Sequence, residues 1–306
     1  MTLCNRGTGR VSVIIPLYNH ASYIVSALES VVTQGSIVKD VIVIDDGSKD
    51  GSLAIAENFG AGHPHFKVLS QENCGAAPTL NRGILTATAD YVAILNSDDL
   101  WAPTRLEQLV EALDLDAGLD LAASGISFIN GHGAEIENVW YEEALDNYVA
   151  RRDLGLALMD ANFLMTTSNF VVRRSVLAKL GGFADLRYAH DMDFGLRIAA
   201  NRRRIGFIDS KLLAYRLHET NTIKENHSNV RVEWAIVASF FLWSLSRNVP
   251  QNAERIQQGW EILEKHNLTW SAQECVRYFN VNPSNSLVNS PLLVDVAMKS
   301  KLLSAV

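Results

Sequence analysis

Apolar runs alternate with amphipathic stretches along the first hundred residues of the chain. Residues 11–16 (VSVIIP) form a continuous apolar run that ends at a proline, which is typical of a strand buried on both faces of a parallel sheet. Further strands are predicted over residues 41–44, 66–69 and 91–95. One face of a helix after the first strand is predicted to carry Ile24, Leu28, Val31 and Val32. Repeated strand–helix–strand units predict an α/β fold: a Rossmann-like, mainly parallel sheet with helices on both faces.

The pattern of the second hundred residues is less regular. Pro103 is predicted to open an amphipathic helix, because Leu106, Leu109, Val110 and Leu113 follow it at helical spacing. The segment over residues 131–148 is polar and acidic and is predicted to be a loop or a sheet edge. Strands are predicted over 119–129, 169–173, 205–208 and 212–217, with helices from Ser175 to Gly181 and over 191–200. Beyond Asn226 the pattern is helical throughout.

Polar residues gather where the predicted parallel strands end. Tyr18 and Asn19 follow the first strand, Asp45-Asp46 end the second, and 96–99 (NSDD) follow the fourth. In open parallel sheets, ligands bind beyond the carboxyl ends of the strands. The sequence therefore predicts a ligand site at this edge.

Asp98-Asp99 is the sharpest chemical feature of the sequence. Two adjacent carboxylates at the end of an apolar strand repel each other unless a cation lies between them. A divalent cation is the expected ligand of this pair, since Mg²⁺ is commonly held by one or two carboxylates together with substrate phosphates. The alternative is that both acids cap the next helix. The Asp45-Asp46 pair favours the cation, although by itself it is typical of an Asp-Gly turn.

Composition narrows the class of protein. A chain of 306 residues with 48% hydrophobic residues can bury a large core, and its net charge of −7 argues against a nucleic-acid partner. The three cysteines, Cys4, Cys74 and Cys275, are widely spaced, which excludes a zinc ribbon and favours a reducing cytoplasm. We expect no secretory signal, because the N-terminus lacks an apolar stretch. The apolar segment 234–245 is too short to span a bilayer, which leaves a core or interface helix or peripheral membrane contact.

Four motifs in order carry a resemblance to a known family. They are VSVIIPLYN, VIVIDDGSKDGS, ENCGAAPTLNRGI and YVAILNSDD. Together they resemble the inverting nucleotide-sugar glycosyltransferases of family two, which have the GT-A fold, over about residues 11–221. Each motif is weak alone, but their order and spacing are specific.

The resemblance implies roles for individual residues in binding the donor. Pro16, Leu17 and Tyr18 would line the base and ribose pocket, and either Asp45 or Asp46 would hydrogen-bond the base. Asn73, Gly75 and Asn81 match the segment that closes over the nucleoside. Asn96-Ser97-Asp98 occupies the place of the family's DxD motif, with Asn96 replacing the first acid. Because an amide supplies no charge, the metal should be held by Asp98, supported by Asp99.

The resemblance also implies a catalytic base and a third metal ligand. Asp191 matches the acidic residue that deprotonates the acceptor hydroxyl, with Asp193 as a second candidate. Helix capping is the alternative role for Asp191. His218 matches a position near the metal or the diphosphate, although a packing role remains open. Arg216 would contact phosphate or form a surface salt bridge, and Trp101 is expected to fill the core.

The predicted activity is transfer of a sugar, preferably from a UDP-sugar, to the hydroxyl of a glycan or lipid-linked acceptor. One displacement with Mn²⁺ or Mg²⁺ would invert the anomeric configuration. Residues 1–100 would form the nucleotide-sugar half of the GT-A domain, 101–225 the acceptor half and 226–306 a C-terminal helical extension. The extension would support a homodimer or contact the membrane. The expected setting is cell-surface polysaccharide synthesis in the cytoplasm, at the inner face of the membrane.

Four other functions are alternatives to sugar transfer. A dinucleotide-dependent oxidoreductase needs GxGxxG after the first strand, but that turn reads PLYNHASYI. A sugar nucleotidyltransferase would usually carry a glycine-rich basic loop there, which is also missing. A phosphohydrolase with Asp45 as nucleophile rests only on the DDGS string. A non-catalytic sugar-nucleotide binding module remains the alternative from a different class.

Overall fold

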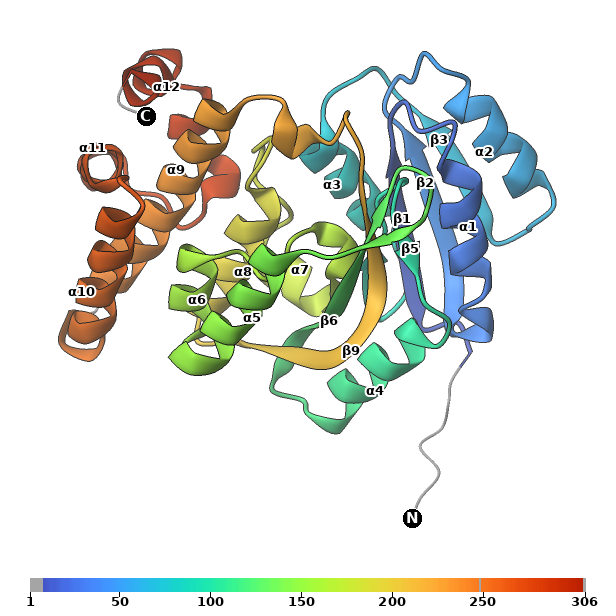
Figure 1. Cartoon of the computed structure of the whole chain (residues 1–306), viewed down its shortest axis with the longest axis horizontal. Coiled ribbons are helices and arrows are strands. Elements are labelled where there is room, and N and C mark those ends of the chain that lie inside the picture. Colours follow the sequence, from blue (N-terminus) through green and yellow to red (C-terminus); the bar gives the residue numbers. More distant parts are fainter. Residues whose placement is uncertain (1–7, 248, 305–306) are drawn as a thin grey trace. The chain divides into compact units, whose positions relative to one another are not determined.

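The computed structural model describes residues 8–247 and 249–304, so Cys4 lies outside the described residues (Figure 1). The chain divides into two compact units that interleave along the sequence. Unit 1 takes in the described residues up to Glu137 together with Thr166–Gly182 and Arg204–His218. Unit 2 takes in Asn138–Met165, Phe183–Arg203 and the described residues from Glu219 onward.

Unit 1 is built on one sheet. Its strands are β1 (Val11–Leu17), β2 (Val38–Asp45), β3 (Phe66–Ser70), β4 (Tyr91–Ile94), β5 (Leu100–Trp101), β6 (Leu119–Asn130), β7 (Glu135–Ile136), β8 (Val171–Arg173) and β9 (Arg204–Leu217). Their order is β3-β2-β1-β4-β8-β6-β9-β5, and β7 pairs with β6. β1 to β4 are parallel to one another, and β6 is parallel to β9. β8 is antiparallel to both of its neighbours, β4 and β6.

The core strands are buried because their apolar side chains face helices. Val13, Ile14 and Ile15 of β1 are fully buried, as are Val41 to Ile44 of β2. The helices of unit 1 are α1 (Ile24–Val32), α2 (Ser52–Ala61), α3 (Ala76–Thr86), α4 (Arg105–Leu115) and α7 (Arg174–Leu180), with 3₁₀ turns at Gly35–Ile37 and Thr167–Asn169. α3 packs so closely on β1 that a Cβ at Gly83 would lie 2.4 Å from Cγ2 of Ile14. The centre of β1 is therefore tightly packed against α3.

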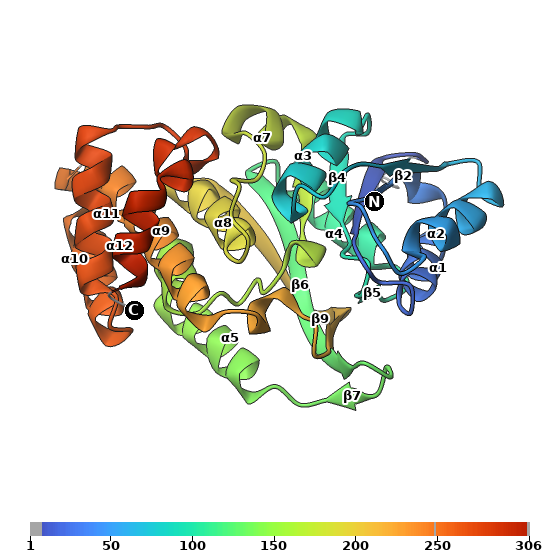
Figure 2. The same cartoon turned by 90° about the horizontal axis from the view of Figure 1, so that it is seen from above.

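Unit 2 is helical among its described residues. It contains α5 (Val139–Arg151), α6 (Leu154–Asp160), α8 (His190–Ala200), α9 (His227–Ser246), α10 (Val249–Lys265), α11 (Thr269–Val281) and α12 (Val296–Leu303), with 3₁₀ turns at Thr222–Lys224, Leu287–Asn289 and Pro291–Val294. α9 packs against α8, α10 and α11 (Figure 2). The apolar segment 234–245 lies in α9 and is largely buried, as expected for a core helix. None of the helices among the described residues is both long and apolar enough to cross a membrane.

Most of the predicted elements are confirmed, and two predictions are wrong. Residues 139–148 are not a loop but belong to α5, which begins where the Asn138 side chain accepts a hydrogen bond from the Tyr141 N–H. The strands predicted over 205–208 and 212–217 are one strand, β9. The polar Asp209-Ser210 step interrupts its apolar pattern, and the pairing register with β6 shifts there. The helical C-terminal segment is confirmed.

Candidate active site

The loops that follow β1 and β2 are joined at the carboxyl edge of the sheet in unit 1. The Asn19 N–H donates to Oγ of Ser48 at 2.9 Å, and the Lys49 N–H donates to Oδ1 of Asn19 at 2.8 Å. Because β1, β2 and β4 are parallel, their loops all leave the sheet at this edge. The polar strand ends singled out in the sequence therefore share one side of the fold.

The two acids of the Asp45-Asp46 pair have different hydrogen bonds. Both oxygens of Asp46 are occupied: Oδ1 accepts from Gln71 and the Cys74 N–H, and Oδ2 accepts from the Gly75 N–H. Burial alone would raise the pKa of Asp46, but these hydrogen bonds outweigh it and the pKa is lowered. Asp46 thus fixes the segment around residues 71–75.

Asp45 retains an unused acceptor. Its Oδ2 accepts from the Gly47 and Ser48 N–H groups at 3.2 and 3.1 Å. Its Oδ1 is buried and has no hydrogen-bond partner among the described residues. Buried polar atoms without a partner are rare in native proteins and call for an explanation such as a ligand that binds there.

The other predicted donor-binding residues surround this edge. Pro16 near the end of β1 is half-buried, and the Tyr18 side chain is 46% exposed. Asn73 is exposed, and Gly75 precedes α3 with a φ of 94°. A Cβ at Gly47 would lie 3.0 Å from the backbone nitrogen of Asn73, so the β2 loop approaches this segment as closely as glycine permits.

Asn96 and Ser97 have separate partners. The Asn96 side chain donates to Oγ1 of Thr166 at 2.9 Å, and its backbone N–H donates to Oγ of Ser168 at 2.8 Å. Ser97 is buried, and its Oγ lies 2.8 Å from Nδ1 of His20. Asn96 therefore anchors the β4 loop to the 3₁₀ turn beside β8.

Asp98 lies in a cluster with two histidines. Its Oδ2 is 2.9 Å from Nε2 of His218 and 4.0 Å from Nε2 of His20. One potential ligand atom from each of the three side chains lies within 4.8 Å of the others. Burial outweighs the nearby Asp98 charge and lowers the pKa of His20. A carboxylate and two imidazoles form a donor set that suits a divalent transition-metal ion.

Asp99 faces protein donors and is not one of the clustered side chains. Oγ of Ser168 donates to its Oδ2 at 2.6 Å, and the Arg216 N–H donates to its Oδ1 at 2.9 Å. Burial and the charge of Asp98 raise the pKa of Asp99 well above the ordinary carboxyl range. Burial alone would also raise the pKa of Asp98, but the His218 hydrogen bond and the nearby His20 outweigh it and lower that pKa. The surroundings therefore favour a negative charge on Asp98 more than on Asp99.

Arg216 stabilises the loop that carries Asp98. Its Nε donates to the carbonyl oxygen of Asp98 at 2.7 Å, and its guanidinium lies 4.8 Å from the ring centre of Tyr23. The residue is only 4% exposed, so the surface salt-bridge interpretation is wrong. Trp101 is buried in the core, as predicted.

Asp191 lies in the first turn of α8, within unit 2. Its Oδ1 accepts from the Met192 N–H at 2.7 Å, and its Oδ2 accepts from Nδ2 of Asn162 at 2.9 Å. Burial raises the pKa of Asp191. A buried carboxyl with a raised pKa is a candidate general base, because efficient proton transfer needs a pKa closer to the working pH.

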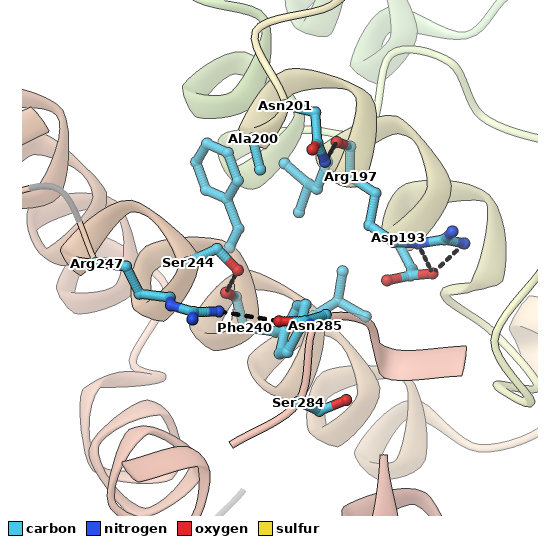
Figure 3. A pocket seen from close by; sticks show the side chains of 12 residues that line it. Asp193, Arg197, Ala200, Asn201, Phe240, Ser244, Arg247, Ser284 and Asn285 are labelled. Carbon is cyan, nitrogen blue, oxygen red and sulfur yellow. Dashed lines mark hydrogen bonds and ion pairs between the residues drawn. The ribbon is translucent and has the colours of Figure 1, made fainter. Parts of the chain in front are cut away.

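Asp193, the second candidate base, forms a buried ion pair. Nε and Nη2 of Arg197 lie 2.9 and 2.8 Å from its Oδ2 (Figure 3). Both residues line a cavity of about 320 Å³ along α8 and α9 within unit 2. Since Arg197 occupies the carboxylate, Asp193 is less suited than Asp191 to accept a proton.

His20 and Asn162 are not among the site residues predicted from the sequence. His20 directly follows the Tyr18-Asn19 pair at the end of β1, so its place in a strand-end loop was an available signal. No sequence signal identifies Asn162, which meets Asp191 only because α6 and α8 pack together within unit 2. Both residues depend on contacts between distant parts of the chain.

Solved structures define the class of fold. The chain is similar to the mannosyltransferase PcManGT from Pyrobaculum calidifontis, in complex with GDP-Man and Mn²⁺, with a TM-score of 0.62 and 19% identity over 98% of this chain and 86% of that one. It is also similar to residues 1–349 of S. aureus TarS in complex with UDP-GlcNAc, with a TM-score of 0.60 and 19% identity over 88% of this chain and 83% of that one. The predicted GT-A fold is confirmed.

Residues 12–181 match the model of Glycosyl transferase family 2, and the chain belongs to this family. The uncharacterized glycosyltransferase YibD of Escherichia coli is 42% identical over 115 residues, which cover 38% of this chain and 33% of YibD. The chain spans 33% and 63% of the lengths of the first two curated relatives that it matches. The predicted family is therefore confirmed.

Proposed function

We propose that the protein is an inverting glycosyltransferase that moves a sugar from a nucleotide-diphosphate donor to an acceptor hydroxyl with the help of a divalent cation. The observation that carries this proposal is the pairing of two features at one sheet edge of unit 1. Asp45 offers a buried acceptor without a partner, and Asp98 lies beside His218. A base N–H and a metal-bound diphosphate are ligands that these two features would satisfy.

The donor would bind along the ends of β1, β2 and β4. Asp45, and not Asp46, is assigned to hydrogen-bond the nucleotide base of the donor, because Asp46 already accepts hydrogen bonds on both oxygens. Tyr18, Pro16 and the segment containing Asn73 and Gly75 would surround the nucleoside. The neighbours' complexes with UDP-GlcNAc and GDP-Man support a nucleotide-sugar donor, and we propose a UDP-sugar.

Asp98 and His218 would hold the cation, Mn²⁺ or Mg²⁺. Their carboxylate and imidazole atoms are already adjacent, and the PcManGT complex contains Mn²⁺. When bound, such a cation acts as a Lewis acid that stabilises the departing diphosphate. Asp99 would support Asp98 by holding the loop in place, since both of its oxygens accept protein hydrogen bonds.

Asp191 would remove the proton from the acceptor hydroxyl as that oxygen attacks the anomeric carbon. The attack and the departure of the diphosphate occur on opposite faces of the sugar, so a single displacement inverts the configuration. Asn162 and the Met192 N–H orient the carboxylate. Burial supplies the raised pKa that a general base needs.

The acceptor and setting follow from family analogy. We propose a glycan or lipid-linked acceptor used in cell-surface polysaccharide synthesis, at the cytoplasmic face of the membrane. Residues 1–100 are assigned to the donor and 101–225 to the acceptor. The helices beyond 225 are assigned to dimer formation or membrane contact.

A thermal-shift screen of UDP, GDP and TDP, each with and without Mn²⁺, tests donor binding. A ligand at 100 times its Kd adds about 2.7 kcal/mol of stability. For a chain of 306 residues, that corresponds to a rise in Tm of about 4 °C. We expect this rise for UDP with Mn²⁺, and no response to any nucleotide would contradict the proposal.

Product analysis separates the remaining functions. Transfer or hydrolysis of UDP-GlcNAc releases UDP, whereas a nucleotidyltransferase releases pyrophosphate from UTP and a sugar phosphate. Nucleotide binding without either product would favour the non-catalytic binding module. Phosphatase activity that Asp45→Asn abolishes, without sugar transfer, would favour the phosphohydrolase.

A further inference from the structure

His20 has two ring nitrogens with different surroundings. Nδ1 lies 2.8 Å from the hydroxyl oxygen of Ser97, and Nε2 lies 4.0 Å from Oδ2 of Asp98. Histidines that bind metals usually donate their second ring N–H to an oxygen, which fixes the tautomer and the ring orientation. The Ser97 hydroxyl stands where such an oxygen is needed, and it is almost fully buried.

The backbone around His20 is also held in place. The His20 N–H donates to Oγ of Ser52, and the Ala21 N–H donates to Oδ2 of Asp50, both at 2.9 Å. Asp50 in turn accepts hydrogen bonds from Ser52. The loop after β1 is therefore fixed by the loop after β2, and the imidazole of His20 is preorganised beside Asp98.

The separations within the cluster suit a shared ion. Two ligand atoms at about 2.1 Å from a tetrahedral or octahedral ion lie about 3.0 to 3.4 Å apart. Oδ2 of Asp98 lies 2.9 Å from Nε2 of His218 and 4.0 Å from Nε2 of His20. One distance is slightly shorter and the other slightly longer than the separation expected for two ligands of one ion. The two imidazole ring centres lie 5.7 Å apart and their planes are nearly perpendicular.

We propose that His20 is a third protein ligand of the cation, so that two imidazoles and one carboxylate make the site prefer Mn²⁺ to Mg²⁺. This inference rests on the proposed metal-assisted sugar transfer. Mg²⁺ prefers oxygen ligands, whereas imidazole favours transition-metal ions. Ser97 acts as a positioning residue, because it reaches the cation only through His20.

Mn²⁺ and Mg²⁺ binding to the whole protein tests the proposal directly. Mn²⁺ is titrated and the free ion is measured by electron paramagnetic resonance, with and without UDP, and Mg²⁺ is measured by competition. His20→Asn keeps an amide that can hydrogen-bond Ser97 but removes the atom at the Nε2 position. His132→Asn is the matched control, because His132 is exposed in the turn before β7.

We expect His20→Asn to weaken Mn²⁺ binding at least about tenfold, since loss of even an outer-sphere partner costs about 10- to 100-fold. Mg²⁺ binding should change less, so that the preference for Mn²⁺ falls. The electron spin-echo signal of bound Mn²⁺ should show two coordinated imidazoles in the native protein and one in His20→Asn. Ser97→Ala should weaken Mn²⁺ binding while both imidazoles stay coordinated.

The proposal is overturned if His20→Asn and His132→Asn bind Mn²⁺ equally well and both give the two-imidazole signal. Circular dichroism shows whether His20→Asn folds. If it does not fold, the number of imidazoles coordinated to Mn²⁺ in the native protein and in Ser97→Ala decides whether the proposal holds. UDP release from UDP-GlcNAc is followed separately. If UDP is released but His20 has no role in metal binding, only this inference is wrong. If Mn²⁺ is bound by imidazole nitrogens but no UDP is released, only the proposed function is wrong.

Discussion

Asp191→Asn should lower the rate of sugar transfer without unfolding the protein. If Asp191 is the general base, its loss removes a contribution of about 10²- to 10⁴-fold to the rate. In free energy this is about 2.7 to 5.5 kcal/mol of transition-state stabilisation. Donor binding should stay unchanged, because the base acts on the acceptor hydroxyl.

The substitution should fit the site without structural damage. The introduced amide oxygen can still accept the Met192 N–H, and its NH₂ group would then face Asn162. Oδ1 of Asn162 is buried without a hydrogen-bond partner among the described residues. A rotation of the Asn162 amide would therefore present an acceptor to the new donor.

The raised pKa of Asp191 makes the native carboxyl a cost to stability. Burial raises this pKa above its ordinary value of 3.8, so the folded protein prefers the protonated acid. As the pH rises from 3.8 to the raised pKa, the unfolded chain ionises first and stability falls. Above the raised pKa the loss stays constant. Asp191→Asn lacks this loss, so it should melt at a higher temperature than the native protein at pH 7.

The assay follows UDP release from UDP-GlcNAc with Mn²⁺ across pH, UDP affinity by calorimetry, and Tm. As the pH is lowered, the rate of the native protein should begin to fall at a pH above 3.8, where Asp191 becomes protonated. The pH profile of Asp191→Asn should lack this fall. Asp193→Asn is the matched control: it removes one partner of the buried Arg197 pair and should cost about 3 kcal/mol of stability. Its rate should stay near native at low temperature. A rate for Asp191→Asn within tenfold of native, or a loss that accompanies a lower Tm, would refute the assignment.

Three further predictions follow from single sites. Asp45→Asn should weaken UDP binding about 10- to 100-fold, as expected for a lost hydrogen bond to a charged group, and unchanged affinity would remove Asp45 from the base site. Burial alone would raise the pKa of Asp160, but hydrogen bonds from Lys265, His266 and Arg151 outweigh it and lower that pKa. Asp160→Asn should therefore lose about 2 kcal/mol in urea unfolding at pH 7, and the difference should shrink as the pH falls below about 4. Burial raises the pKa of Cys275 to about 12, so iodoacetamide should label it only after unfolding, as mass spectrometry can check, while the exposed Cys74 labels in the native protein.

The sequence predicts the sheet well because the hydrophobic pattern of the strands matches their burial in the structure. The strands β1, β2 and β4 are buried on both faces, and their apolar runs have no other good explanation. α5 is different, since Val139, Trp140 and Val149 are all at least 49% exposed. Its apolar residues are not sorted onto one face, so periodicity could not identify the helix.

The position of the candidate site could be predicted from the sequence, but the contacts of its side chains could not. Parallel strands place the motif residues at one edge whatever their side chains do. The partners of each side chain depend on long-range contacts, such as that between His20 and Ser97, 77 residues apart. The sequence therefore left open which acid of the Asp45-Asp46 pair would meet the base.

Hydrogen bonds divide the labour within the two pairs of adjacent acids at the sheet edge. In Asp46 and Asp99, both carboxyl oxygens accept hydrogen bonds from protein donors. Asp45 keeps one buried oxygen without a partner among the described residues, and Asp98 joins the histidine cluster. A carboxylate bound to several protein donors cannot take a ligand without breaking those bonds, so it serves to fix a loop or a helix. Its neighbour, held on the fixed backbone, is the one that can bind a ligand. Substitutions within the Asp45-Asp46 pair should therefore differ in kind: Asp46→Asn should lower stability, because the pKa of Asp46 is lowered by its hydrogen bonds, whereas Asp45→Asn should weaken nucleotide binding.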